Sequence, residues 1–493
     1  MKYLVSASEM RRYDNNTIER IGIPACVLME RAALAAAEAA EAYCAGAEGR
    51  KSALIMAGMG NNGGDGLAAA RLLSEKGYRV EVWCVGNCGR ASEQWKQQRA
   101  ILENYPVEFA KRPVRAEYTV LLDALFGVGL SREVSGEYEE AVRIFNGLEG
   151  RKIALDLPSG IDSDTGKVWG CAVKADDTVT FGFCKKGLMM YPGYGYAGRI
   201  VTAEIGISER SFYGEVPDMY AYDEEPISLM PKRDSGGNKG TFGKVLLVAG
   251  SMNMAGAAVL AARAAYRAGA GMVKVLSAEE NRSIIQQAVP EALFGTWGLL
   301  AESMEWADVI AIGPGLGKRD AARQCLELVI RESQKPLLVD ADGLNLLAED
   351  AVLRDVLAGQ GAAGRQVIVT PHVGELARLT GKTAAVCKED LPGTGRGLAE
   401  TIHGVVAAKD ARTFICKEEH AVCMNLSGNC GMATAGSGDV LAGIIAGLLA
   451  QGMEAFDAAA VGAYVHGLAG DRVSREKGKY ACMAWDIVEA AGC

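Results

Sequence analysis

The sequence has few histidines, few aromatic residues and no run of basic residues. Only 4 of the 493 residues are histidine, 6% are aromatic, and 61 acidic residues outnumber 52 lysines and arginines, for a formal net charge of −9. A protein that binds nucleic acid needs clustered basic side chains to neutralise phosphates. Because no such cluster is present, we expect no nucleic-acid partner.

Long apolar runs are also missing. No stretch approaches the roughly 18 uninterrupted apolar residues of a membrane span, and the N-terminal residues MKYLVSASEMRRYDNNTIER contain no apolar core of a secretion signal. With 49% apolar and 23% charged residues, the composition is that of a compact globular enzyme. We therefore expect a cytoplasmic protein with no membrane partner.

The thirteen cysteines form no recognisable framework. They are dispersed over a long chain, and Cys84 and Cys88 have no second cysteine pair or histidine cluster to complete a zinc site. Disulfide frameworks are typical of small secreted domains. We expect the cysteines to be structural or incidental.

The chain is long enough for at least two domains, because single cores rarely exceed about 300 residues. From Lys51 to about Thr202, the apolar runs SALIMAG, YRVEVWCV, TVLLDALFG, KIALDLPSG and DTVTFGF alternate with helical segments. This alternation predicts a Rossmann-like parallel sheet covered by helices on both faces. Before it, we expect a helix capped by Ser6 or Ser8 and an alanine-rich helix from about Ala25 to Tyr43.

A segment rich in proline and glycine, roughly 209–240, separates this region from a second alternating series. That series comprises KVLLVAG, MVKVLSA, DVIAIGPG, PLLVDADG, QVIVTPH and TFICKE, and it ends in helices from Gly438 to Ala490. The predicted fold class is therefore α/β, with two tandem layered α/β domains.

Glycines and carboxylates cluster after the first strands. GMGNNGGDG, residues 58–66, precedes the helical stretch LAAARLLSEKG, and its glycines would let the backbone approach a ligand, although a glycine-rich turn without a ligand is the alternative. Asp123 in LLDALFGVGL, and Asp156 and Ser159 in LDLPSGID, follow later strands. Such strand ends converge on one crevice, where oxygen ligands suit a hard cation. Alternatively, Asp156 merely caps the next turn.

Together with the upstream IPACVLMERAA, these motifs resemble the N-terminal epimerase domain of the NAD(P)H-hydrate repair family over about residues 1–210. The resemblance implies epimerisation at C6 of the hydrated nicotinamide ring, with Asp156 as acid and base. It implies a potassium site of Asn62, Asp123 and Ser159. The residues implied around the dinucleotide are Asn61, Asn62, Gly63, Gly64, Asp65, Gly127, Val128, Gly129, Leu130, Ser131, Arg132, Glu133 and Asp156.

A second glycine cluster, ATAGSGDVLAGIIAGLL, places Asp439 at the start of an apolar helix. Backbone amides there would stabilise charge on a transferring phosphoryl group, and Asp439 would accept a proton from an attacking hydroxyl. The alternative is an aspartate that only complements the helix dipole.

With NKGTFGKVLLVAGS, IGPGLG, LLVDADGLNLLA and TPHVGELARLTG, this cluster closely resembles the ribokinase-like dehydratase domain of the same family, over about residues 225–493. The resemblance implies ADP or ATP as co-substrate, Mg²⁺ as cofactor, Asp439 as base and Gly438 in the anion hole. It also implies Ala257, Gly315 and His372 near the dinucleotide. His372 alone would more simply be a hydrogen-bonded loop residue.

Family members commonly have Lys-Gly-x-x-Thr beside the nucleotide. We place this segment at Lys417, Glu418, Glu419, His420 and Ala421, where the glycine and the hydroxyl are missing. A glutamate beside nucleotide phosphates would be repulsive. This placement makes the choice between ADP and ATP an open question.

The sequence thus predicts a bifunctional repair enzyme with an epimerase domain at 1–213 and a dehydratase domain at 222–493. The first would interconvert the R and S hydrates of NAD(P)H, and the second would dehydrate the S form with ADP, giving NAD(P)H, phosphate and AMP. We expect a homo-oligomer. The alternatives are a ribokinase-like small-molecule kinase and an N-terminal domain that binds without catalysing.

Overall fold

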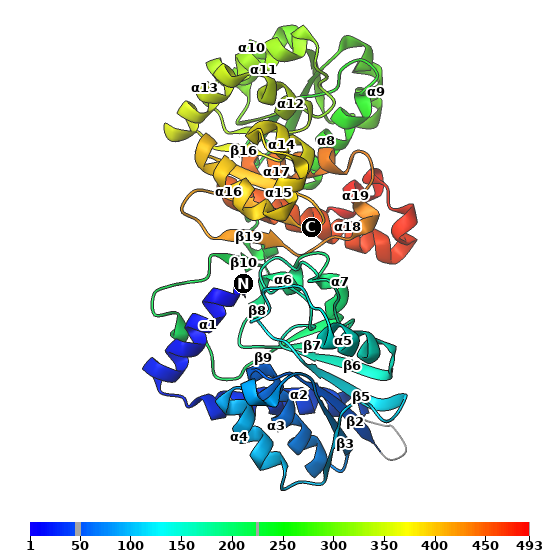
Figure 1. The fold of residues 1–493 in the computed structure, drawn as a ribbon. Helices are drawn as coiled ribbons and strands as arrows, with labels where there is room; N and C mark the ends of the chain where they lie inside the picture. The colour runs from blue at the N-terminus through cyan, green and yellow to red at the C-terminus, as the bar shows by residue number, and fades with distance from the viewer. Residues whose placement is uncertain (45–50, 223–225, 493) are drawn as a thin grey trace. The chain divides into compact units, whose positions relative to one another are not determined.

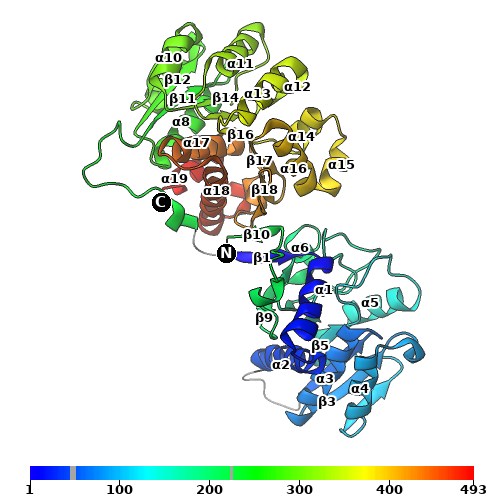
Figure 2. The same cartoon turned by 90° about the vertical axis from the view of Figure 1, so that its left-hand side faces the viewer.

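The computed structural model describes residues 1–44, 51–222 and 226–492. Its chain divides into two compact units, one formed by Tyr3 to Met219 and the other by the residues from Tyr220 onward with Met1 and Lys2. Both are layered α/β structures (Figures 1 and 2), which confirms the predicted fold class.

The N-terminal unit is built on a seven-stranded sheet in which all neighbouring strands are parallel. Its order is β4 (Val107–Ala110), β3 (Arg79–Cys84), β2 (Ser52–Ala57), β5 (Glu117–Ala124), β6 (Glu149–Leu155), β7 (Asp177–Phe181) and β9 (Arg199–Ala203). The order reverses between β2 and β5. In such sheets, ligands bind beyond the carboxyl ends of the strands at this switch point.

Helices cover both faces of this sheet, as strand periodicity requires. Ile55 of β2 packs into a core with residues of α2 (Ala25–Cys44), α3 (Asn61–Glu75) and α4 (Glu93–Leu102). Leu54 and Met56 point to the other face and pack against α5 (Glu137–Gly147). Figure 1 shows α2, α3 and α4 grouped together in blue. Both faces of the sheet are therefore covered, and a ligand can reach the sheet only at the ends of its strands.

The glycine-rich stretch differs from its prediction, because α3 starts at Asn61 and includes most of it. A Cβ on Gly58 would lie 2.0 Å from Leu125 O, one on Gly63 would lie 1.9 Å from Gly58 O, and one on Gly66 would lie 2.5 Å from the Ala124 Cβ. These glycines let α3 sit directly on β2 and β5. A Cβ on Gly60, in contrast, would meet nothing within 4 Å.

The N-terminal segment supplies one more helix and one short strand pair. Ser6 caps α1 (Ala7–Asn16) through a capping box with Glu9, and a π-helix (Thr17–Ile21) follows. Strand β1 (Lys2–Val5) runs parallel to β8 (Cys184–Lys185), with Val5 opposite Lys185. The short helices α6 (Lys186–Met189) and α7 (Tyr194–Ala197) complete the unit.

The C-terminal unit has a larger sheet. Its strands run in the order β13 (Leu293–Thr296), β12 (Met272–Ser277), β11 (Lys244–Val248), β14 (Val309–Ile312), β15 (Leu337–Val339), β16 (Val367–Val369), β17 (Val405–Lys409), β18 (Thr413–Cys416) and β19 (Val422–Asn425). Pairs from β13 to β17 are parallel, and β17, β18 and β19 pair antiparallel. The sequence did not predict β13, β17 or β19.

Helix α17 (Ser437–Ala450) packs between α8 (Ala255–Arg267) and α18 (Ala455–Lys477), as Figure 2 also shows. No helix in the described part of the chain is both long and apolar enough to cross a membrane. The remaining helices are α9 (Arg282–Ala288), α10 (Leu300–Trp306), α11 (Asp320–Glu332), α12 (Asp342–Glu349), α13 (Ala351–Ala362), α14 (Val373–Thr380), α15 (Ala384–Glu389), α16 (Leu391–Ile402) and α19 (Ala484–Ala490).

Candidate functional site

Asp156 lies directly after β6 in a left-handed backbone conformation, with φ of 67°. Its Oδ1 is 2.5 Å from Lys185 Nζ and accepts hydrogen bonds from Thr180 Oγ1 (3.3 Å) and Phe181 N (3.4 Å). Its Oδ2 would be 3.3 Å from a Cβ on Gly127 in the loop after β5. One carboxylate oxygen is thus anchored by three donors, while the other faces the neighbouring loop.

Asn62, on the first turn of α3, faces the same loop. Its Nδ2 donates to Phe126 O (3.0 Å) and Leu155 O (3.1 Å), which fixes the orientation of the amide. Its Oδ1 is buried and has no hydrogen-bond partner within the described residues. A buried acceptor of this kind calls for a donor or a cation.

Asp123 and Ser159 hold the loops after β5 and β6 together. Ser159 donates from its backbone N to Asp123 Oδ2 (2.7 Å) and from Oγ to Asp123 Oδ1 (2.6 Å), and Ser159 Oγ accepts from Phe126 N (2.8 Å). Burial raises the pKa of Asp123 to about 6, against the lowering effect of the Ser159 hydrogen bonds. The structure therefore brings Asp123 and Ser159 together, and Phe126 links them to Asn62.

The other residues predicted around the dinucleotide occupy two places. In the loop after β5, Leu130 N donates to Gly127 O (3.4 Å), and Val128 O accepts a hydrogen bond from Arg11 of α1 (3.2 Å). On α3, Gly63 and Gly64 are buried and Asp65 is partly buried. The exposed members of the set are Asn61, Gly129, Ser131, Arg132 and Glu133.

Sequence reasoning missed two charged residues of this site, Lys185 and Asp14. The Lys185 side chain is 1% exposed. Burial raises the pKa of Asp14. Burial also raises the pKa of Asp65 well above its usual range, and the negative charges of Asp156 and Asp14 raise it further. Neither residue belongs to a glycine motif. The only signal for Lys185 was its position shortly after the run DTVTFGF.

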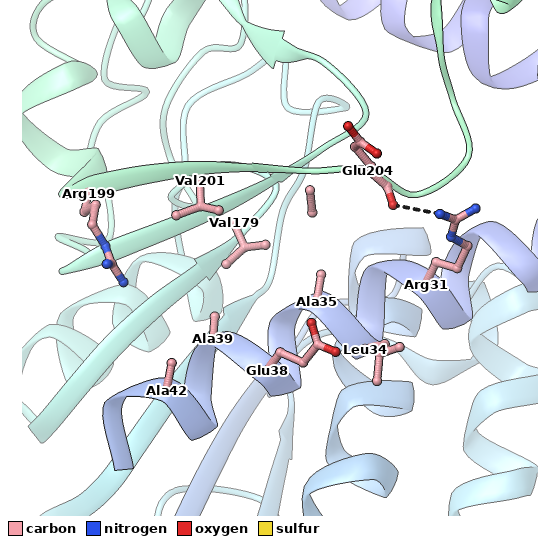
Figure 3. Close-up of a pocket in the computed structure, with 11 residues that line it drawn as sticks. Arg31, Leu34, Ala35, Glu38, Ala39, Ala42, Val179, Arg199, Val201 and Glu204 are labelled. Atoms are coloured by element: carbon pink, nitrogen blue, oxygen red, sulfur yellow. Dashed lines mark hydrogen bonds between the residues drawn. The ribbon is translucent and has the colours of Figure 1, made fainter. Parts of the chain in front are cut away.

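A separate hollow of about 490 Å³ lies between α2 and strands β7 and β9 (Figure 3). Leu34, Ala35 and Ala39 of α2 line it opposite Val179 and Val201, and Arg31 donates to Glu204 O at its rim (3.2 Å). None of the predicted site residues contributes to it.

In the C-terminal unit, Asp439 lies in the first turn of α17. Burial raises its pKa to about 7, and the charge of Asp340 adds to this. Lys409, at the carboxyl end of β17, donates to Asp340 Oδ1 (2.9 Å), and its Nζ would be 3.6 Å from a Cβ on Gly438. The start of α17 thus brings Asp439 together with Lys409 and Asp340. This arrangement of one lysine and two carboxylates at a helix N-terminus suits phosphoryl transfer.

His372 lies beside Lys409, because a parallel bridge joins these two residues. It caps α14, where its Nδ1 accepts a hydrogen bond from Gly374 N (2.9 Å) and Glu375 accepts one from His372 N (2.9 Å). Burial, and then the positive charge of Lys409, lower its pKa. His372 is therefore both a capping residue and a neighbour of the Lys409–Asp340 pair.

Ala257 and Gly315 also converge on this edge of the sheet. A Cβ on Gly315 would lie 2.8 Å from the Ala257 Cβ. Leu260, one helical turn beyond Ala257, would meet a Cβ on Gly436 at 2.5 Å. The start of α8 therefore connects the loop after β14 with the start of α17.

The predicted nucleotide segment, Lys417, Glu418, Glu419, His420 and Ala421, does not lie beside Lys409. These residues form the β18–β19 turn, where Glu418 pairs with His403 (3.0 Å) and the His420 ring packs on Phe456 (4.0 Å). Since Cys416 pairs with Val406, the turn lies near the amino end of β17. Lys409 lies at the other end of β17, three residues beyond Val406. Three residues of extended chain span roughly 10 Å, so Lys409 and Val406 are about that far apart.

The sequence offers a second position for this segment, which was not considered because β17 was not recognised as a strand. Lys409 and Thr413 are four residues apart, the spacing of lysine and threonine in Lys-Gly-x-x-Thr, with Asp410 in place of the glycine. A nucleotide segment placed at Lys409 to Thr413 would keep both the lysine and the hydroxyl and would lack only the glycine.

Two family models match the chain. The model described as NAD(P)H-hydrate dehydratase covers residues 245–491, and that described as YjeF-related protein N-terminus covers residues 25–187. The bifunctional NAD(P)H-hydrate repair enzyme of Moorella thermoacetica is 37% identical over 99% of this chain and 95% of its own length. That of Coxiella burnetii is 36% identical, with coverages of 99% and 98%.

The chain belongs to the family of bifunctional NAD(P)H-hydrate repair enzymes.

Among solved structures, a ribokinase-like superfamily protein from Enterococcus faecalis is 29% identical, with a TM-score of 0.50 over 56% of this chain and 94% of that one. The ribokinase-like fold of the C-terminal unit is thereby confirmed. The two family models match different units of this chain, the dehydratase model the C-terminal unit and the other model the N-terminal unit.

Proposed function

We propose that this protein repairs hydrated NAD(P)H with two active sites, an epimerase in residues 1–213 and a dehydratase in residues 222–493. The epimerase interconverts the R and S hydrates, and the dehydratase consumes the S form with ADP or ATP. The observation that carries the proposal is the placement of Asp439 at the start of α17, facing the Lys409–Asp340 pair.

In the epimerase site, C6 of the hydrate is a hemiaminal carbon. Loss of its hydroxyl, assisted by the ring nitrogen, gives a planar cation that water can attack from either face. Asp156 Oδ2 is the oxygen available for proton transfer, because Oδ1 already accepts from three donors.

A potassium ion fits beside this carboxylate. Asn62 Oδ1 offers a buried oxygen without a partner, and the oxygens of Asp123 and Ser159 lie on the adjoining loops. Such oxygens suit a hard cation. When bound, the ion supplies a fixed positive charge near the dinucleotide.

In the dehydratase site, the nucleotide phosphorylates the C6 hydroxyl, and phosphate then leaves as the C5=C6 bond forms. Asp439 accepts the hydroxyl proton, the amide of Gly438 and its neighbours face the transferring phosphoryl group, and Lys409 neutralises its charge. The residues described include no group of three or more histidine, cysteine, aspartate or glutamate side chains that could hold a metal ion. Mg²⁺ would therefore be carried mainly by the nucleotide phosphates.

The test is to incubate the full chain with mixed R and S hydrates of NADH, with and without ADP, and to follow each epimer by chromatography. Loss of both epimers only with ADP, together with recovery of NADH absorbance, supports both activities. Accumulation of a stable phosphorylated product would instead identify a small-molecule kinase.

Two further predictions complete the proposal. We place the protein in the cytoplasm, which fractionation would test. We also predict a homo-oligomer, whose mass light scattering would measure.

A further inference from the structure

Lys185 is buried in the epimerase site, and its ammonium group is fully used. Its Nζ contacts Asp156 Oδ1 (2.5 Å), Thr180 Oγ1 (3.1 Å) and Phe181 O (2.8 Å). An ammonium group has three N–H donors, so none remains for a ligand. With a side chain only 1% exposed, Lys185 acts on the reaction through the charged groups around it and not by contact with a ligand.

Asp156 is consequently a carboxylate with a compensated charge and a fixed orientation. Lys185, Thr180 and Phe181 all act on Oδ1, while Oδ2 faces Gly127. Oδ2 is therefore the oxygen left for proton transfer.

Asp65 has the opposite environment. It lies partly buried on α3, and it makes no hydrogen bond or ion pair with any residue that the structure describes. The charged groups that act on it electrostatically are Asp156 after β6, Asp14 on α1 and Lys185 on β8. Asn62, three residues before Asp65 on α3, lies beside Gly127, the residue that Asp156 Oδ2 faces. Burial, and then the two negative charges, favour its protonated form.

Two carboxyl groups with different surroundings in one site can divide the roles of acid and base. We propose that Asp65 donates the proton to the departing C6 hydroxyl, that Asp156 accepts the proton of the returning water, and that Lys185 is the positioning residue that fixes these roles. The proposal rests on the proposed epimerase function and refines it, since Asp156 alone need not both give and take the proton. Asn62 Oδ1, buried and unpartnered near Asp156, independently marks the crevice as a ligand site.

The step balances without any redox partner. The O–H proton of Asp65 moves to the C6 hydroxyl, the C6–O bond breaks, and water leaves as the ring nitrogen lone pair forms a C=N bond. Water then adds to the other face, the new C6–O bond forms, and its proton passes to Asp156 Oδ2. The two carboxyl groups regain their starting states by exchanging a proton with water.

The test measures epimerisation by the full chain without nucleotide, after subtraction of the uncatalysed rate. Asp65→Asn should lower kcat about 10²- to 10⁴-fold, the range for a lost general acid. In the wild type, kcat/KM should fall as pH rises through the pKa of Asp65.

The fall of kcat/KM at high pH is the basic limb of the pH profile. Substitutions of neighbouring charged residues should move this limb in opposite directions, which a merely structural role of those residues would not do. Asp14→Asn removes a negative charge and should move the limb to lower pH. Lys185→Met removes a positive charge, so it should move the limb to higher pH and also lower kcat, with Lys185→Arg restoring part of both. Glu19→Gln, an exposed site just after α1, is the matched control and should move nothing.

Wild-type kcat in Asp65→Asn, or an unmoved limb in both Asp14→Asn and Lys185→Met, would overturn the proposal. ADP-dependent dehydration and thermal unfolding report whether each variant is folded. If Asp65→Asn does not fold, the two limb shifts still decide. Failure of the proposed function is distinct, because the wild type would then show no epimerisation at any pH.

Discussion

Asp439 must be ionised to accept a proton, yet burial raises its pKa to about 7. We therefore predict that kcat/KM for dehydration falls as pH drops below about 7. Asp439→Asn should lower dehydration about 10²- to 10⁴-fold above pH 7, where the wild-type carboxylate is ionised, and by less at lower pH. A profile that is flat between pH 6 and 8 would contradict this role.

The same shift has a sign for stability. A carboxyl whose pKa rises on folding stabilises the folded state at low pH, and this contribution is lost as pH rises from the ordinary aspartate pKa of 3.8 through about 7. The asparagine variant should therefore have a higher Tm than the wild type at pH 8, with a smaller difference at pH 4. Thermal unfolding at the two pH values measures both.

Substitutions of Lys409 and Lys417 distinguish the two possible positions of the nucleotide segment. Lys409→Met removes the positive charge beside Gly438, so it should raise the KM for ADP by roughly 10- to 100-fold, as expected for a charged hydrogen bond. Lys417→Met changes an exposed residue near the far end of β17 and serves as the matched control. An effect confined to Lys417→Met would restore the original placement.

At the residue scale, sequence reasoning found groups that belong to motifs and missed those that reach a site from elsewhere in the fold. Asp123, Asp156 and Ser159 lie at the ends of recognisable strands. The structure places Ser159 against Asp123 and Asp156 beside the loop after β5. Lys185 comes from a two-residue strand. Lys409 ends VVAAK, whose alanines and lysine have low strand propensity.

At the element scale, α3 depends on close backbone contact rather than on helix propensity. Gly63→Ala would place a Cβ 1.9 Å from Gly58 O, so it should destabilise the protein by about 1–3 kcal/mol, the usual cost of overpacking. Gly60→Ala enters open space with φ of −92° and is the matched control. Chemical denaturation compares the two variants, and equal stabilities would contradict the packing role.

The start of α3 shows why element boundaries are hard to predict. Each glycine costs about 1 kcal/mol of helix propensity relative to alanine, so the pattern of apolar residues places the start at Leu67. The helix starts six residues earlier, at Asn61, because packing against β2 and β5 outweighs propensity. Strands with continuous apolar runs, such as β2 and β5, were predicted because both their faces are buried.

At the scale of the whole molecule, the two active sites should work independently through a diffusible intermediate. Asp156→Asn with ADP should consume the S hydrate and leave R to its slow spontaneous conversion, whereas Asp439→Asn should only equilibrate the two. An equimolar mixture of the two variants should then consume both epimers. A mixture that performs no better than Asp156→Asn alone would show that the intermediate passes only within one chain.

The layered organisation of the whole chain was predictable because alternating apolar runs and helices specify parallel sheets. The antiparallel addition of β18 and β19 was not, since short edge strands carry a weak pattern. Because β17 was not predicted, the sequence also could not show that Lys409 lies at its carboxyl end.

The backbone of Asp156 bears on how any mutational scan of this protein should be read. At φ of 67°, asparagine and glycine are tolerated, whereas alanine or a β-branched residue adds backbone strain at this position. A loss of activity in Asp156→Ala would therefore mix a chemical effect with a conformational one. Asp156→Asn separates them, and in a deep scan position 156 should tolerate glycine and asparagine in abundance measurements while rejecting every substitution in activity measurements.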